Sequence, residues 1–106
     1  MTKVSVVVLS WNTAELTCAC LRSVSAAFAA EGIDGELVVV ENGSDDGSAE
    51  RIATEFPEAV LLRNEENRGY ASGVNQGVAA SHGEWVLLLG SDALLLEGAL
   101  TSLLGF

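Results

Sequence analysis

Four short apolar runs alternate along the chain with segments of helical periodicity, and this alternation constrains the fold more than any other feature. The runs are residues 4–9, 37–40, 59–63 and 85–89. Predominantly aliphatic runs of this length are typical of strands that are buried on both faces of a parallel sheet. The order βαβαβαβα therefore predicts an α/β fold, a three-layer sandwich with helices on both faces of a mainly parallel sheet.

The segments between the runs carry helix start and stop signals. A first helix is expected to follow Asn12, which forms a capping pair with Glu15, and to end at Gly32 and Gly35. Further helices are expected over residues 48–55, over residues 70–81 and within residues 94–104. The helix over 48–55 stops ahead of Pro57, because the residue that precedes a proline resists helical backbone.

The composition is that of one acidic globular domain. The 106 residues are 49% hydrophobic, which suffices for a single core, and 5 Lys and Arg against 15 Asp and Glu give a net charge of −10. Such a charge repels polynucleotides, so no nucleic-acid partner is expected. The longest apolar stretch, residues 85–100, contains Asp92 and Glu97, so no transmembrane segment is expected either.

Cysteine usage indicates a reduced compartment. Cys18 and Cys20 are the only two cysteines, and at this spacing within a helix they point to different faces. We therefore expect neither a disulfide nor a metal site there, and interpret both as small apolar residues of a cytoplasmic protein. No signal-peptide pattern follows Met1.

Polar residues follow each predicted strand. In an open parallel sheet ligands bind at the carboxyl ends of the strands, so these residues converge on one edge. They are Ser10, Trp11 and Asn12; Glu41, Asn42, Gly43 and Ser44; Asn64, Asn67, Arg68 and Gly69; and Gly90, Ser91 and Asp92. Turn chemistry explains each segment singly. Their convergence, with carboxylates directly after two strands, favours a ligand site.

The motifs that are absent narrow the range of possible ligands. The chain has no phosphate loop, no G-x-G-x-x-G after its first strand and no nucleophile elbow, which disfavours nucleotide hydrolases, dinucleotide dehydrogenases and acyl transferases. The acids Glu41 and Asp92 remain, with Arg68 as a nearby cation. A carboxylate such as Asp92 suits a divalent cation that shares substrate phosphates, which would let an acidic protein hold an anion.

Four segments in register, residues 4–12, 37–48, 64–77 and 85–93, resemble the inverting, nucleotide-sugar-dependent glycosyltransferases of family 2, most of all their rhamnosyltransferase-like branch. The Asn- and Gly-rich segment is the most specific, because a helix carries Gly73 and Gly77 only for a packing reason. The resemblance implies the Rossmann-like, nucleotide-binding half of a GT-A fold. The implied ligand is a UDP-, dTDP- or GDP-linked sugar.

The resemblance also implies the binding residues. Those carried over for the nucleotide are Ser10, Trp11, Asn12, Glu41, Asn42, Ser44, Asn67, Arg68, Gly69, Asn75 and Ser91. The family usually has Asp where Glu41 stands, in contact with base or ribose. An Asx-type turn at Asp46 also explains Asn42, Ser44 and Asp45 without any ligand. Asn75 is unusual inside a helix unless its amide has a partner.

The metal motif of the family is incomplete in this sequence. The segment Gly90-Ser91-Asp92 falls at the family's D-x-D position and keeps only the last acid. The resemblance thus implies Asp92 as the ligand of Mg²⁺ or Mn²⁺. The general base of the family lies downstream of this motif, so no catalytic residue is assigned up to Phe106. We expect residues 1–106 to be a single, truncated, donor-binding portion, whose full-length parent is cytoplasmic or attached peripherally to a membrane.

Three alternatives stay open. A Rossmann-like methyltransferase would use Glu41 to hold a ribose, although the glycine-rich first loop is missing. A receiver-like domain lacks the acid pair expected after the first strand. The third alternative is a non-catalytic binding or scaffold module, or a fold fragment, which self-associates into a homo-oligomer through an exposed sheet edge.

Overall fold

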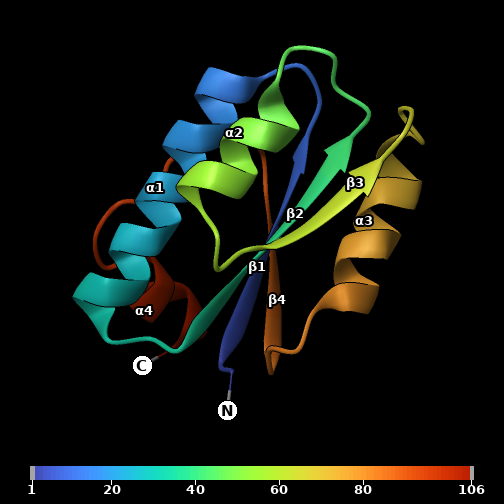
Figure 1. The fold of residues 1–106 in the computed structure, drawn as a ribbon. Coiled ribbons are helices and arrows are strands. Elements are labelled where there is room, and N and C mark those ends of the chain that lie inside the picture. The colour runs from blue at the N-terminus through green and yellow to red at the C-terminus, as the bar shows by residue number, and fades with distance from the viewer. Residues whose placement is uncertain (1, 106) are drawn as a thin grey trace.

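The computed structural model describes residues 2–105 and has the predicted alternation of strands and helices (Figure 1). The elements are β1 (Val4–Ser10), α1 (Ala14–Glu31), β2 (Gly35–Asn42), α2 (Ser48–Glu55), β3 (Val60–Asn64), α3 (Tyr70–Ala80), β4 (Trp85–Leu89) and α4 (Ala99–Leu104). The α/β fold expected from the periodicity is confirmed.

The sheet has the strand order β3-β2-β1-β4, and all its neighbours are parallel. Ser10 pairs in register with Glu41, and Glu41 with Arg63, so the first three strands end at nearly the same level. On the other side of β1, Val8 pairs with Leu89. The four loops that follow the strands therefore meet at one edge, as the topology predicts.

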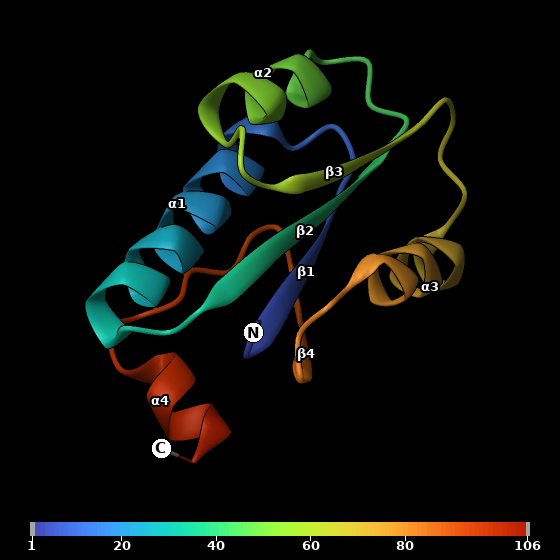
Figure 2. The ribbon, with the colours of Figure 1, turned by 60° about the horizontal axis from the view of Figure 1, so that its bottom comes forward.

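The helices form two layers around this sheet. Figures 1 and 2 show α1, α2 and α4 on one face and α3 alone on the other. The main core lies between α1 and the central strands and is aliphatic, with Val6, Leu21, Val24 and Val39 fully or almost fully buried. No helix within residues 2–105 has the length and hydropathy needed to cross a membrane.

Cys18 and Cys20 are free and buried in this core, as predicted. Burial, with the charge of Asp92 as a second cause, raises the pKa of the Cys20 thiol to about 11. Both residues therefore act as small apolar side chains.

Two glycines let α3 lie close to the sheet. A Cβ atom at Gly73 would be 2.7 Å from Cδ2 of Leu9, and one at Gly77 would be closer still to Cγ1 of Val7. Real side chains do not tolerate such approaches, so the packing role expected for these glycines is confirmed.

One local prediction was wrong. Asn12 and Glu15 form no capping pair: α1 begins at Ala14, and the Asn12 amide oxygen instead accepts a hydrogen bond from the backbone N–H of Asp45 at 2.9 Å. Glu15 pairs with Arg51 at 2.6 Å. The fourth helix, Ala99–Leu104, lies within the expected segment, and it begins directly after Gly98, whose φ of +88° keeps the preceding residue out of the helix.

Candidate functional site

Two adjoining cavities lie at the carboxyl edge of the sheet, where the ligand site was expected. The larger one, of about 450 Å³, is lined by Val7, Leu9, Thr13, Leu16, Tyr70, Val74, Leu88, Leu89, Gly90, Ser91 and Asp92. The smaller one, of about 250 Å³, is lined by Leu9, Ser10, Trp11, Asn42, Asn67, Tyr70 and Ser91. Because Leu9, Tyr70 and Ser91 line both, the cavities form one continuous depression across the ends of β1 and β4.

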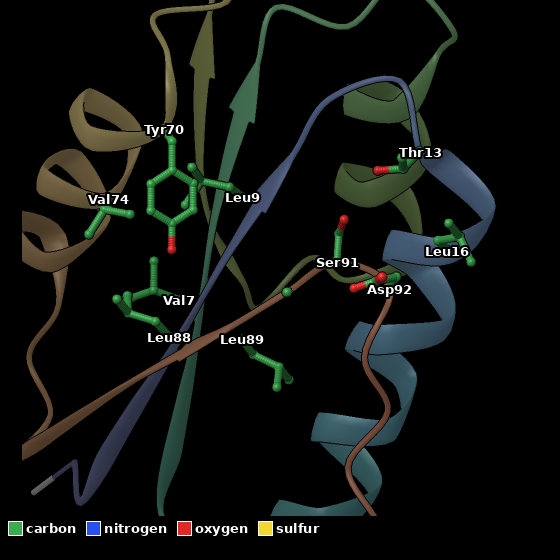
Figure 3. A pocket seen from close by; sticks show the side chains of 11 residues that line it. Val7, Leu9, Thr13, Leu16, Tyr70, Val74, Leu88, Leu89, Ser91 and Asp92 are labelled. Carbon is green, nitrogen blue, oxygen red and sulfur yellow. The ribbon is translucent and has the colours of Figure 1, made fainter.

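The larger cavity is apolar at one end and polar at the other. Figure 3 shows the Tyr70 ring of α3 above Val7 and Leu88. Ser91 and Asp92 lie at the opposite end, beside the first turns of α1. An apolar floor with a few convergent polar groups is the usual composition of a small-molecule site.

The Glu41 carboxylate is turned into the loop that follows β2. Its side chain is only 2% exposed, and both its oxygens are 3.2 Å from the backbone nitrogen of Ser44. The Ser44 hydroxyl also donates to it. Ser44 therefore shapes the turn, as turn chemistry predicts, and the contact of Glu41 with a base or ribose stays a prediction.

Asp46 ties the same loop to two helices. Its carboxylate accepts hydrogen bonds from the backbone N–H and the hydroxyl of Ser48, at the start of α2, and from the backbone N–H of Ala14, at the start of α1. The hydrogen bond from the Ser48 hydroxyl is the main cause that lowers the pKa of Asp46. The expected Asx-type turn is therefore present, and it also caps α1 across the structure.

The side chain of Asn42 is buried and organises the loop that follows β3. Its Oδ1 atom accepts hydrogen bonds from the backbone N–H of Arg68 at 2.9 Å and from Nδ2 of Asn64 at 3.0 Å. Its Nδ2 atom donates to the Gly69 carbonyl at 3.3 Å. Asn64 is joined in turn to Gln76 of α3 by two amide hydrogen bonds of 2.8 and 2.9 Å.

Close backbone packing joins the loops after β2 and β3. Gly43 has φ +81°, and a Cβ atom on it would lie 2.5 Å from the carbonyl carbon of Glu66. Asn67, which lines the smaller cavity, accepts a hydrogen bond from the backbone N–H of Gly69 at 2.8 Å. Only glycine fits at position 43 on both counts.

Arg68 differs from the other basic side chains. Lys3, Arg22, Arg51 and Arg63 each form an ion pair with a glutamate. Among the Lys and Arg residues, all of which lie within the described part of the chain, Arg68 alone forms no ion pair with a described carboxylate. Arg68 is exposed and lines neither cavity itself, but it lies in the loop between Asn67 and Tyr70, which do.

Asp92 is an exposed carboxylate that lines the larger cavity, in a turn closed by the hydrogen bond from the Ala93 N–H to the Gly90 carbonyl at 3.0 Å. Within residues 2–105 no three His, Cys, Asp or Glu side chains gather as metal ligands. The donor set still fits Mg²⁺ or Mn²⁺, which are commonly held by one carboxylate together with substrate phosphates and water.

The remaining predicted residues divide into two groups. Trp11 is exposed and lines the smaller cavity, and Ser91 lines both cavities. The side chain of Ser10 is buried and hydrogen-bonded to Thr17 at 2.8 Å, so its hydroxyl already has a partner within the protein. Asn75 is exposed on α3 and lines neither cavity. Its amide was expected to need a partner, and at this exposed position solvent can supply one.

Sequence reasoning placed Asn64 at this edge but did not single out Tyr70 or Gln76 as site-forming residues. Tyr70 is 73% exposed and lines both cavities. A signal for it was present, because an aromatic residue follows Gly69 at the first position of α3, next to the loop that was expected to bind the nucleotide.

The family model for glycosyl transferase family 2 matches residues 5–106. The chain belongs to this family. It is 33% identical over 90 residues to the succinoglycan biosynthesis protein ExoO of Rhizobium meliloti, with 84% of this chain and 25% of that protein aligned. It is 31% identical over 96 residues to a PGL/p-HBAD biosynthesis glycosyltransferase of Mycobacterium tuberculosis, which covers 88% of this chain and 36% of that protein.

Solved structures agree with the fold. TarS of S. aureus, residues 1–349, superposes with a TM-score of 0.83 at 24% identity and covers 98% of this chain and 32% of that one. The mannosyltransferase PcManGT of Pyrobaculum calidifontis, solved with GDP-Man and Mn²⁺, has a TM-score of 0.76 at 29% identity. The match covers 87% of this chain and 28% of that one. The architecture is that of GT-A glycosyltransferases, and the chain spans about a quarter to a third of the proteins it matches.

Proposed function

We propose that this chain is the donor-binding portion of a glycosyltransferase. The parent enzyme transfers a sugar from a nucleoside-diphosphate sugar to an acceptor hydroxyl, with inversion at the anomeric carbon. The observation that carries the proposal is the double cavity at the carboxyl edge, with Asp92 at its polar end and Asn67 in its wall. Arg68 follows Asn67 in the chain, is exposed, and has no ion-pair partner among residues 2–105. A cation and a carboxylate at one edge suit a diphosphate.

The two cavities suggest how the donor is divided between them. Trp11 and Tyr70 flank the smaller cavity and offer aromatic faces to the base or ribose. The buried Glu41 lies beneath the Ser44 turn and supports it. The diphosphate then extends toward Asp92 in the larger cavity. TarS has been solved with UDP-GlcNAc and PcManGT with GDP-Man, which supports a nucleotide sugar as the ligand class.

Asp92 would hold a divalent cation, Mg²⁺ or Mn²⁺, which when bound neutralises charge on the departing nucleoside diphosphate. Arg68 adds a second positive charge to the same anion. Inverting transfer also needs a general base that takes the proton of the acceptor hydroxyl. We place that base outside residues 1–106, in keeping with the chain spanning about a quarter to a third of its relatives.

We further assign the chain to the rhamnosyltransferase-like branch, on the resemblance of its four segments. Titration calorimetry with UDP, dTDP and GDP tests the donor class and ranks the bases. Binding of at least one of these nucleotides supports the proposal. Tight binding of S-adenosylmethionine with no binding of the three would overturn it in favour of a methyltransferase.

A second proposal concerns the sheet edge and follows from the scaffold alternative. Strand β4 is an edge strand of the sheet, and Trp85, Val86 and Leu88 are exposed on it. We propose that the 106-residue chain self-associates through this edge, since an unpaired apolar edge strand is a template for pairing with another chain.

A further inference from the structure

We propose that Asn42 is a positioning residue, which holds the loop after β3 so that Arg68 is presented to the diphosphate of the donor. The inference rests on the proposed function for its ligand, and on the hydrogen-bond network of the loop for its geometry. It gives Asn42 a role through Arg68: the residue borders the smaller cavity, but both ends of its amide are hydrogen-bonded within the protein.

Both ends of the buried Asn42 amide form hydrogen bonds with the loop after β3. Asn42 is 4% exposed, and its Oδ1 atom accepts from the Arg68 backbone N–H at 2.9 Å while its Nδ2 atom donates to the Gly69 carbonyl at 3.3 Å. Two adjacent backbone groups of an exposed loop are thus tied to the end of β2. A buried strand end is a rigid support, so the backbone of Arg68 is fixed while its side chain stays free.

The orientation of the Asn42 amide is itself determined by its neighbours. Asn64 donates one Nδ2 hydrogen bond to Asn42 and one to Gln76, and its own Oδ1 accepts from Nε2 of Gln76 at 2.9 Å. An Asn42 amide turned by 180° would set its NH₂ group against two donors, the Asn64 amide and the Arg68 N–H. The Asn64–Gln76 pair therefore selects the one orientation of Asn42 that accepts from Arg68.

The fixed backbone has consequences for both parts of the site. Arg68 has no carboxylate partner among the described residues, so ordering its backbone reduces the entropy lost when the guanidinium closes on an anion. The next residues, Gly69 and Tyr70, begin α3. Tyr70 is also held by the packing of α3 against β1 at Gly73 and Gly77, so loss of the Asn42 hydrogen bonds should displace Arg68 more than the Tyr70 ring.

Calorimetry of the 106-residue chain with UDP and with uridine separates this role from a purely structural one. If the chain binds dTDP or GDP instead of UDP, the pair compared is dTDP with thymidine or GDP with guanosine. The variants are Asn42→Ala, Arg68→Ala and their double mutant. Ser5→Ala is the matched control, because Ser5 is equally buried and loses its hydrogen bonds to Glu36 and Gly83 at the far end of the sheet. We expect Asn42→Ala to weaken diphosphate binding roughly tenfold and nucleoside binding less than about twofold.

The double mutant should bind the nucleoside diphosphate no more weakly than Arg68→Ala, because both changes remove the same contact. Asn42→Asp keeps the acceptor for the Arg68 N–H and should restore part of the affinity. Gln76→Ala, at a half-buried helix position that tolerates alanine, should also weaken binding of the nucleoside diphosphate, by a smaller factor than Asn42→Ala does. Equal losses for diphosphate and nucleoside, or additive losses in the double mutant, would overturn the inference.

Hydrogen exchange of the Arg68 amide tests the geometry without a ligand. The amide should be protected in the wild-type chain and in Asn42→Asp, and lose protection in Asn42→Ala while Ser5→Ala leaves it unchanged. If the wild-type chain binds no nucleotide, the proposed function of this chain fails. In that case, equal exchange rates of the Arg68 amide in wild type and Asn42→Ala would overturn the positioning inference as well. Loss of protection in Asn42→Ala would still support the claim that Asn42 holds the Arg68 backbone.

Discussion

Asn12 and Ser44 join the loops after β1 and β2: the backbone N–H of Asn12 donates to the Ser44 hydroxyl oxygen at 2.8 Å. The same hydroxyl donates its proton to the buried Glu41 carboxylate. Asn12 has φ +51°, a left-handed conformation that is uncommon outside glycine and tolerated by asparagine. One serine thus connects a strained backbone position with a buried charge.

Ser44→Ala should therefore destabilise the fold. The substitution leaves the Asn12 N–H and the Glu41 carboxylate each without one partner, which costs about 1–3 kcal/mol in the free energy of unfolding. Urea denaturation followed by circular dichroism measures this loss. Ser102→Ala, at an exposed position of α4, is the control and should change stability by less than about 0.5 kcal/mol. Equal stability of the two variants would refute the connecting role of Ser44.

Gly77→Ala tests the close contact between α3 and the sheet. In a free helix this change would stabilise by up to about 1 kcal/mol through helix propensity. Here the new methyl group meets Val7 of β1, so we expect a net loss of at least about 1 kcal/mol and a displaced α3. Asn75→Ala, on the exposed side of the same helix, should be neutral or slightly stabilising. Thermal unfolding measures the change in stability of both variants. A stabilised Gly77→Ala variant would show that α3 is not closely packed on the sheet.

The pKa of Asp46 predicts how the stability of the loop depends on pH. Because hydrogen bonds, first of all from the Ser48 hydroxyl, lower this pKa in the folded protein, the carboxylate stabilises the fold above its ordinary pKa near 3.8. This contribution is lost as the pH falls through the lowered pKa. Asp46→Ala should cost about 1 kcal/mol at pH 7 and less at pH 2–3. Asp45→Ala is the control, and a pH-independent cost of Asp46→Ala would contradict the account.

The β4 edge makes a prediction about assembly. Light scattering should show a mass that rises with concentration for the wild-type chain. Val86→Glu places a charge on the exposed edge strand and should abolish this rise, whereas Leu103→Glu on α4 should not. A monomeric wild-type chain at millimolar concentration would rule out self-association through β4.

The elements were predictable where local signals decide them. The helix Ser48–Glu55 and the strand Trp85–Leu89 have the expected bounds, the first because Pro57 forces its end and the second because an aliphatic run is bounded by polar residues and glycine. The cap of α1 was not predictable from neighbours in sequence. Its first N–H is bound by Asp46, 32 residues away, and no local pattern reports such a partner.

The site shows the same division. That Trp11, Asn42, Asn67, Ser91 and Asp92 gather at one edge followed from the alternation of strands and helices alone. What their side chains do there did not follow. Hydrogen bonds between segments 12 to 33 residues apart decide it: they bind the side chain of Asn42 into the network around Arg68, and that of Asn12 to the loop after β2.

The most direct test of the donor-binding account is calorimetric titration of the strongest binder among UDP, dTDP and GDP, with and without Mn²⁺. The variants are Asp92→Asn, which removes the charge at constant size, and Glu97→Gln, an exposed acid of the same segment that lines neither cavity of the site. The account predicts that Mn²⁺ strengthens nucleotide binding at least tenfold in wild type and Glu97→Gln, and not in Asp92→Asn. Equal enhancement by Mn²⁺ in Asp92→Asn, or no nucleotide binding by the wild-type chain, would contradict it.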